Sequence, residues 1–263
     1  MNKDAELFRS GRLSDAISEL AISIKRNASD IEARSRLVEY YCVATEYEKA
    51  ERQLEIIASI DPRTSIRIVE IRQLLRAAIA RKGLWKHGRA PELLTPMPEH
   101  AQSRLRAIIA KREGDYSGVE ENLLLASQQR PAFELLIDDK IVTNFRDLDD
   151  FVADVLEVYT PTGKYLWIPL QEISEAIFSQ PKRPMDFAFI PAELTLLNGT
   201  SGYVYVPCIY NSLNEIPEEK YLTGRETDWY EQQGIYQGMG LRCFLKDDES
   251  VSLYEIKTIR SIK

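Results

Sequence analysis

The amino-terminal half of the chain repeats one pattern of apolar and polar positions. Each of three segments has an apolar residue, a small or apolar residue three positions later, and another apolar residue seven positions after the first. The residues concerned are Leu13, Ala16 and Leu20, then Tyr47, Ala50 and Leu54, and finally Tyr116, Val119 and Leu123. Because residues at this spacing lie on one side of an α-helix, each segment is expected to form a helix with one buried side.

The copies are spaced like the units of a helical repeat. The second copy follows the first by 34 residues, and the third follows the second by 69, which is one more than two periods. A period of 34 residues is typical of tetratricopeptide repeats (TPRs), in which pairs of antiparallel helices stack because neither helix covers its own apolar side. The first half is therefore predicted to be a TPR-like array of stacked hairpins.

Periodicity and boundary residues predict seven helices in this half. They span residues 3–10, 13–27, 30–44, 47–60, 63–86, 99–113 and 116–129. One helix of the expected array is missing, because prolines occupy its place and proline disrupts a helix interior. These prolines are Pro91, Pro96 and Pro98.

After Pro131 the pattern changes to period-two alternation with frequent turn residues, which indicates strands. Two hairpins, one short helix and two closing strands are expected. The hairpins join residues 152–159 to 164–168 and 194–197 to 203–206, the helix spans 170–178, and the closing strands span 240–246 and 251–259.

The two halves also differ in charge, which supports a division into two domains. Residues 1–130 hold 22 Lys and Arg against 19 Asp and Glu, whereas residues 131–263 hold 12 against 22. The acidic second half argues against nucleic acid as a partner. The predicted fold class is α+β, with a TPR-like α-helical repeat domain at residues 1–131 and a small, mainly antiparallel β-rich α+β domain at residues 132–263.

The sequence shows no sign of membrane insertion or of secretion. No stretch approaches the ~18 uninterrupted apolar residues that a membrane-spanning helix requires. The first twelve residues are polar, where a secretory signal would be apolar. We therefore expect a cytoplasmic protein.

Cysteine and histidine are too sparse to indicate a metal site or a catalytic relay. Cys42, Cys208 and Cys243 are odd in number and far apart, so each is interpreted as a small buried apolar residue. The two histidines, His87 and His100, lie in a proline-rich stretch that is expected to be a loop. The sequence therefore predicts no metal, no cofactor and no catalytic residue.

The densest polar cluster is Arg146, Asp147, Asp149 and Asp150, with Leu148 among them. Three carboxylates near one turn could hold Mg²⁺ or share a proton. The favoured interpretation is structural: the aspartates cap the start of a helix or lie at a domain interface, and Arg146 forms a salt bridge with them.

Residues 224–229, Gly-Arg-Glu-Thr-Asp-Trp, combine a planar cationic donor, a hydroxyl, a carboxylate and an indole. Such a set suits a buried polar network or a surface that contacts a peptide. The simpler interpretation is a structural loop that includes Thr227 and in which Arg225 pairs with Asp228 beneath Trp229.

The predicted helix over residues 63–86, with the residues that follow it, is strongly basic. Residues 63–89 hold eight basic side chains and one acid, so a strip that binds an acidic partner is conceivable. Arg72 and Arg76 would share one side of the helix, while Arg81 falls on nearly the opposite side. A solvated helix surface is therefore favoured, and docking of the acidic second half against this helix is the alternative.

Five short motifs of the second half occur in an informative order after the helical repeats. They are residues 146–150 (RDLDD), 165–169 (YLWIP), 184–186 (PMD), 205–207 (YVP) and 224–229 (GRETDW). In this order the chain resembles the ImpE/SciE/TagJ family of accessory proteins encoded in bacterial type VI secretion clusters, and the resemblance covers nearly its whole length. It implies a cytoplasmic, non-enzymatic adaptor that binds the N-terminal helix of the small sheath subunit. Such an adaptor would influence sheath assembly or its disassembly by the AAA+ ATPase of the cluster.

Our leading hypothesis is a groove, lined by the repeat helices or by their junction with the β-rich half, that takes the apolar side of a partner helix. The residues expected to contact the partner are Tyr40, Tyr41, Tyr47, Trp85, Trp167, Arg225 and Trp229. Two alternatives remain. One is a metal-dependent hydrolase that uses Asp147, Asp149 and Asp150, and the other is a general chaperone for secreted effectors.

Overall fold

The seven predicted helices are all present in the computed structural model, which describes residues 2–211 and 218–262. They are α1 (Lys3–Arg9), α2 (Leu13–Arg26), α3 (Ile31–Val43), α4 (Tyr47–Ile60), α5 (Ser65–His87), α6 (Glu99–Glu113) and α7 (Tyr116–Gln129). A short 3-10 helix, Pro62–Thr64, precedes α5. No helix occupies residues 88–98, in agreement with the three prolines.

The repeat is visible in the backbone before α2, α4 and α7. Gly11, Thr45 and Gly114 occupy equivalent positions, and all three have positive φ angles, of 83°, 56° and 75°. A left-handed residue ends one helix and turns the chain into the next. Thr45 makes this turn despite a branched Cβ, which disfavours the left-handed region.

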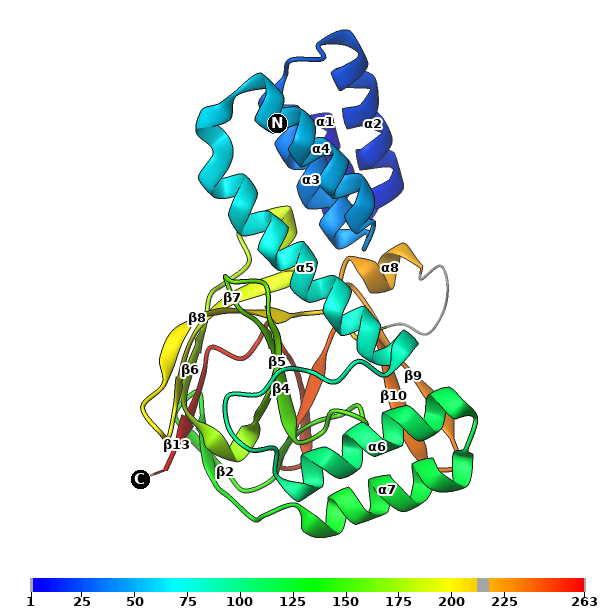
Figure 1. Cartoon of the computed structure of the whole chain (residues 1–263), viewed down its shortest axis with the longest axis vertical. Helices are drawn as coiled ribbons and strands as arrows, with labels where there is room; N and C mark the ends of the chain where they lie inside the picture. The colour runs from blue at the N-terminus through cyan, green and yellow to red at the C-terminus, as the bar shows by residue number, and fades with distance from the viewer. Residues whose placement is uncertain (1, 212–217, 263) are drawn as a thin grey trace.

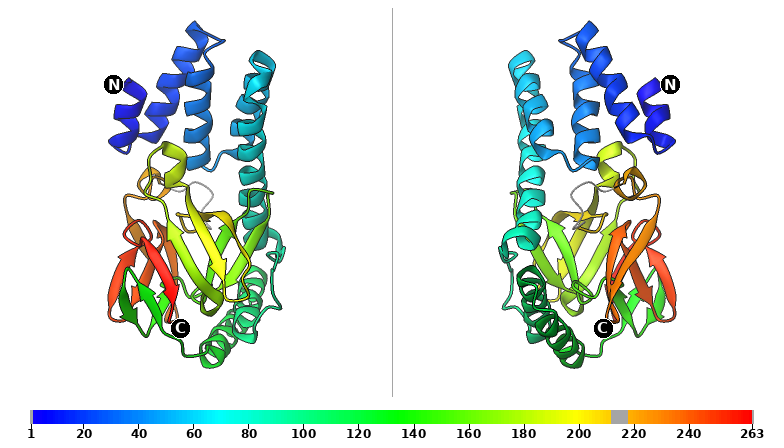
Figure 2. Two further views of the ribbon diagram at one scale, coloured as in Figure 1. Left: turned by 90° about the vertical axis from the view of Figure 1, so that its left-hand side faces the viewer. Right: turned by 90° about the vertical axis from the view of Figure 1, so that its right-hand side faces the viewer.

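The stacked array expected from the repeat ends after two hairpins. The α1–α2 and α3–α4 hairpins lie together at one end of the molecule, α5 extends away from them, and the α6–α7 hairpin lies at the other end beside the strands (Figures 1 and 2). The third copy therefore packs differently. Val119 and Leu123 are buried, but Tyr116 is about half exposed. The extended segment 88–98 separates α6 from α5, so α6 and α7 do not continue the stack.

The second half is built from antiparallel strands, as predicted. An eight-stranded sheet has the order β2-β1-β13-β6-β7-β8-β4-β5, and two small sheets have the orders β10-β9 and β12-β11-β3. The first strands are β1 (Leu135–Ile137), β2 (Lys140–Val142), β3 (Phe145–Asp147), β4 (Val155–Tyr159), β5 (Tyr165–Pro169), β6 (Ile173–Phe178), β7 (Phe189–Leu196) and β8 (Ser201–Pro207). The short helix α8 (Glu219–Leu222) precedes β9 (Thr227–Gln232), β10 (Ile235–Gly240), β11 (Cys243–Lys246), β12 (Glu249–Ser252) and β13 (Thr258–Ser261).

Both predicted hairpins are confirmed, as β4–β5 and β7–β8. The helix predicted over residues 170–178 is wrong. A single 3-10 turn, Leu170–Glu172, is followed by strand β6, which pairs with β7 and β13 in the middle of the large sheet. Isoleucine and phenylalanine favour this pleated, buried position over a helix. The predicted strand over 251–259 is also divided, because β12 and β13 lie in different sheets.

The apolar core is continuous across the predicted domain boundary at Pro131, which lies in the connection between α7 and β1. One cluster of buried side chains joins residues of α1–α7 to residues of β4, β5, β7 and β8. Trp85 of α5, for example, packs edge-on against Phe151 with ring centroids 5.8 Å apart. None of the helices within residues 2–211 and 218–262 is long and apolar enough to cross a membrane.

A candidate binding cavity between the helices and the strands

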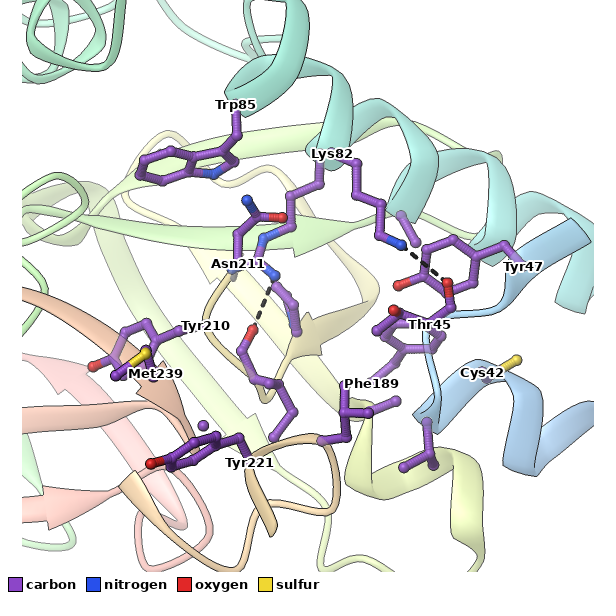
Figure 3. A pocket seen from close by; sticks show the side chains of 18 of the residues that line it. Cys42, Thr45, Tyr47, Lys82, Trp85, Phe189, Tyr210, Asn211, Tyr221 and Met239 are labelled. Atoms are coloured by element: carbon purple, nitrogen blue, oxygen red, sulfur yellow. Dashed lines mark hydrogen bonds between the residues drawn. The ribbon is translucent and has the colours of Figure 1, made fainter. Parts of the chain in front are cut away.

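A cavity of about 370 Å³ lies where the helices meet the strands, and we call it the junction cavity. The α3–α4 turn and α5 form one wall, and β7, β10, α8 and the residues after β8 form the other. Lys82 and Trp85 extend from α5, whereas Tyr210 and Tyr221 face them from the strand side (Figure 3). The cavity thus lies at the junction of the helices with the strands, which is one of the two places where a groove was expected.

Aromatic rings form much of the wall of the junction cavity. Tyr47 and Trp85, both expected to contact a partner, are in the lining, and each is only 6% exposed. Phe189 lies between Tyr47 and Tyr159, with ring centroids 6.4 and 5.4 Å away. Packed rings of this kind offer a large apolar contact area and lose little side-chain entropy on binding.

Two cations of α5 are held in the wall by backbone carbonyls. The Nζ of Lys82 donates to the carbonyl oxygen of Thr45 at 2.9 Å and lies 4.5 Å from the ring centroid of Tyr47 (Figure 3). Partial burial lowers the pKa of Lys82. The Nη1 of Arg81 donates to the carbonyl oxygen of Ile209 at 2.9 Å. The wall therefore combines apolar rings with positive charge.

The prediction that Arg81 lies on a solvated helix surface is wrong. It is only 7% exposed and forms a two-point ion pair with Glu157 of β4, with N–O distances of 2.9 and 2.7 Å. Arg242 is fully buried and also pairs with Glu157. Burial alone would raise the pKa of Glu157, but the two guanidinium groups outweigh it and lower the pKa to about 2.

The polar network continues from Arg242 to the aspartate cluster. The Nε of Arg242 lies 3.3 Å from an oxygen of Asp147. The hydroxyl of Tyr210 donates to the other oxygen of Asp147 at 2.8 Å, and its ring lies in the wall of the junction cavity. The cavity and the cluster are therefore linked through Tyr210.

The aspartates bind backbone N–H groups of nearby turns and strands. Asp147 accepts from the backbone N–H of Asp149, Asp149 accepts from those of Phe151 and Gly238, and Asp150 accepts from that of Tyr236, at 2.8–3.1 Å. Burial is the main cause that raises the pKa of Asp147 to about 6 and that of Asp149 to about 7. Arg146 lies 3.4 Å from Asp150, in line with the expected salt bridge.

The helix-capping interpretation of this cluster is wrong. The aspartates follow strand β3, and residues 148–154 form turns and bends rather than a helix. Within the described residues, no three His, Cys, Asp or Glu side chains are grouped so that they could hold a metal ion. The arrangement is that of a structural network that fixes the β9–β10 hairpin to the end of β3.

Two of the residues expected to contact a partner lie in the core instead. Tyr40 is fully buried, stacks on Phe8 at 5.1 Å and donates to Asp4 at 3.0 Å. Trp167 is 1% exposed, and its indole N–H donates to the hydroxyl of Tyr165 at 2.6 Å. Neither side chain can reach a partner unless the core opens.

The remaining candidates are distributed over separate surfaces. Tyr41 is half-buried near Lys49, and Trp229 is half-buried against the ring of Tyr210, 5.7 Å away. Arg225 is exposed and donates to the carbonyl oxygen of Arg9 at the end of α1. The structure therefore brings Tyr47 and Trp85 together in the junction cavity and leaves the other candidates outside its lining.

The loop expected to pair Arg225 with Asp228 is organised differently. Thr227 donates to the carbonyl oxygen of Leu241 at 2.7 Å, and Asp228 accepts from the hydroxyl of Tyr221 at 3.2 Å and from the backbone N–H of Trp229 at 2.8 Å. Strand β9 begins at Thr227, so backbone pairing with β10 controls these side chains.

The burial expected for the cysteines is found for two of the three, whereas the location expected for the histidines is wrong. Cys42 and Cys208 are buried, as expected, and burial raises the pKa of both thiols, to about 12 for Cys208. Cys243 is half-buried. The prediction that both histidines lie in a loop is wrong, because each belongs to a helix. His87 is the last residue of α5, and His100 is buried in the first turn of α6, where its Nε2 lies 2.8 Å from Gln171.

Comparison with known proteins supports the family expected from the motifs. The ImpE protein family matches residues 139–260. The type VI secretion system accessory component TagJ of Pseudomonas aeruginosa is 24% identical over 254 residues, which are 97% of this chain and 89% of TagJ. The chain is thus similar to the ImpE/TagJ family, over residues 139–260 in the family match and over nearly its whole length in the comparison with TagJ.

A solved structure shares the fold of this chain. The crystal structure of protein VPA1032 from Vibrio parahaemolyticus matches with a TM-score of 0.92 and 24% sequence identity. The match covers 100% of this chain and 98% of that chain. The same arrangement of helices and strands thus occurs in a crystal structure.

Proposed function

We propose that the protein is a cytoplasmic, non-enzymatic accessory component of a type VI secretion system and acts as an adaptor for another protein. The similarity to TagJ, which is named as such a component, supports this role. The partner we propose is the small sheath subunit, bound through its N-terminal helix. Binding would influence assembly of the sheath or its disassembly by the AAA+ ATPase.

The observation that carries the proposal is the junction cavity, with its aromatic wall and its cations. An amphipathic helix binds by inserting apolar side chains into a pocket of this kind. About 370 Å³ is enough for one or two such side chains. Contacts with the rings of Tyr47 and Trp85 would provide affinity, whereas Lys82 and the exposed Lys86 would orient the helix through its acidic residues or its carboxyl end.

A variant that fills the cavity tests the proposal. Met239 of β10 is half-buried in the lining, so Met239→Trp should occupy the space that an inserted side chain needs (Figure 3). Isothermal titration calorimetry with a peptide of the sheath subunit's N-terminal helix should give at least about a tenfold larger Kd for Met239→Trp than for the wild type. Ile141→Trp, on the exposed edge strand β2, is the matched control and should leave the Kd unchanged.

Two results would contradict the proposal. The first is that Met239→Trp and Ile141→Trp both bind the peptide with the Kd of the wild type, since binding would then not use the cavity. The second is capture of secreted effectors from cells without sheath genes, which would favour a chaperone.

A further inference from the structure

The basic helix α5 has more positive charge than its neighbours neutralise. Among the eight basic residues at 63–89, five have partners: Arg63 with Asp61, Arg67 with Glu39, Arg72 with Glu51, Arg81 with Glu157, and Lys82 with the carbonyl oxygen of Thr45. The side chains of Arg76, Lys86 and Arg89 form no ion pair or hydrogen bond with any residue that the structure describes. All three are exposed. Lys86 lies at the junction cavity, whereas Arg76 and Arg89 lie elsewhere.

Arg76 and Arg89 line a second depression, which we call the α5 groove. Its volume is about 770 Å³, and it lies between α4, α5, the segment after α5 and the turn of the β4–β5 hairpin. Leu75 is buried in its wall, and Ile79 is 48% exposed there. Arg76 and Ile79 lie one turn apart on α5, and Arg89 lies in the segment that follows the helix, so the groove offers one apolar contact and two cationic contacts.

Most other charges along the α5 groove are already paired. Arg72 pairs with Glu51 at 2.7 Å, and Lys164 pairs with Glu92 at 2.8 Å. The remaining acid, Glu48, interacts electrostatically with Lys82 of the junction cavity. Arg76 and Arg89 are therefore the charges available to a ligand.

We propose that the α5 groove binds a short acidic segment of another protein, with an apolar side chain on Ile79 and carboxylates on Arg76 and Arg89. Arginine suits this role because its planar guanidinium binds a carboxylate through two hydrogen bonds. Because the groove's three glutamates engage other cations, its available positive charge is confined to two points, which suits two carboxylates and not the continuous phosphate backbone of a nucleic acid. Tyr47 lines both depressions. Arg76, Ile79 and Arg89 line only the α5 groove, so the inference does not depend on the function proposed for the junction cavity.

Fluorescence anisotropy with a synthetic probe tests the inference. The probe is a fluorescein-labelled twelve-residue peptide of glutamate and leucine in helical spacing, and its control has glutamine in place of every glutamate. The glutamate peptide should bind more tightly at low salt than at high salt. At low salt, the glutamine peptide should bind at least about tenfold more weakly than the glutamate peptide. The double variant Arg76→Glu/Arg89→Glu should weaken binding of the glutamate peptide by at least about tenfold.

Control variants make the result specific to the groove. Lys257→Glu reverses an exposed charge elsewhere on the surface and should leave the Kd of the probe unchanged. Met239→Trp should also leave the Kd of the probe unchanged. Failure of the binding proposed for the junction cavity can therefore be distinguished from failure of the binding proposed for the α5 groove. Circular dichroism melts should show that the double variant folds like the wild type, because both arginines are exposed.

Three outcomes would overturn the inference. One is equal affinity for the glutamate and glutamine peptides, and another is an unchanged Kd for the double variant. The third is a monomer–dimer equilibrium in sedimentation that the double variant abolishes, because the groove would then bind a second copy of this chain.

Discussion

Arg81 of α5 and Glu157 of β4 are 76 residues apart in the sequence, and their side chains meet through two hydrogen bonds, of 2.9 and 2.7 Å, where the helices pack on the strands. Both side chains are nearly inaccessible to solvent. Arg242 shares the same carboxylate. Two buried cations therefore share one carboxylate, with Asp147 as a second acid 3.3 Å from Arg242, and the junction between the two halves depends on Glu157.

Loss of the Glu157 charge should destabilise the protein more than loss of Arg81. Glu157→Gln leaves two buried guanidinium groups without their shared counter-ion and should lower the free energy of unfolding by about 3–5 kcal/mol. Arg81→Met should cost less, because Glu157 keeps Arg242. Urea denaturation followed by tryptophan fluorescence measures both values, and a larger loss for Arg81→Met would contradict the shared-carboxylate account.

Asp149 should make stability depend on pH. Its pKa is about 7 in the folded protein, mainly because of burial, against about 3.9 in the unfolded chain. A carboxyl whose folded pKa is raised stabilises the fold fully below its unfolded pKa, and this contribution is lost as the pH rises through the folded pKa. The free energy of unfolding of the wild type, relative to Asp149→Asn, should therefore fall between pH 4 and pH 7. A constant difference over this range would show that Asp149 is already ionised in the folded protein at pH 4.

Thr45→Gly should stabilise the protein. Thr45 has a φ of 56° in the turn before α4, and the other two repeat copies have glycine in this place. Relief of the branched side chain should raise the free energy of unfolding by about 1 kcal/mol. The reverse change, Gly114→Thr, is the matched control. No atom lies within 4 Å of the Cβ that would be added at Gly114, so the expected loss of about 1–2 kcal/mol would report backbone strain alone. A thermal melt of each variant measures both changes.

Gly238 should not tolerate even a methyl group. A Cβ at this position would lie 2.3 Å from the ring of Tyr210, which links the junction cavity to the aspartate network. Gly238→Ala should therefore destabilise the protein by about 1–3 kcal/mol. Gly202→Ala in β8 places its methyl group in open space and should change the free energy of unfolding by less than about 0.5 kcal/mol. Equal effects of the two substitutions in urea denaturation would disprove the close packing of Tyr210 on β10.

The helices could be predicted closely because apolar residues recur at helical spacing and glycine or proline marks several helix ends. The strand β6 could not, since residues 173–178 are few, include the helix formers Glu175 and Ala176, and show no strict alternation of apolar and polar residues. Only pairing with β7 and β13 makes this segment a strand. The local sequence pattern predicts helices, whose hydrogen bonds lie within one segment. A short central strand forms only by pairing with strands far along the chain, so its own sequence does not reveal it.

The junction cavity was predictable only in part. Tyr47 and Trp85 were expected as contacts because they are aromatic residues of the helical half, but the same argument selected Tyr40, which lies outside the lining of the cavity. Glu157 was not among the expected site residues, although the sequence contains a signal for it: a charged residue in the middle of the apolar strand 155–159. A charge in such a position requires a buried partner. The identity of that partner, Arg81, depends on how α5 crosses the sheet, which no local pattern contains.

The continuity of α5 has a mechanical consequence. One uninterrupted helix of 23 residues contacts both the amino-terminal hairpins and the sheet. Lys82 reaches the α3–α4 turn, and Glu70 and Arg81 reach the strands. Thr45 and Tyr47 belong to the hairpin side of the junction cavity, and Tyr159 and Phe189 belong to the sheet side. Any tilt of the hairpins relative to the sheet would therefore widen or narrow the cavity, and a ligand held between the two sides would resist that tilt. Occupancy of the cavity should thus stiffen the whole molecule along its long axis.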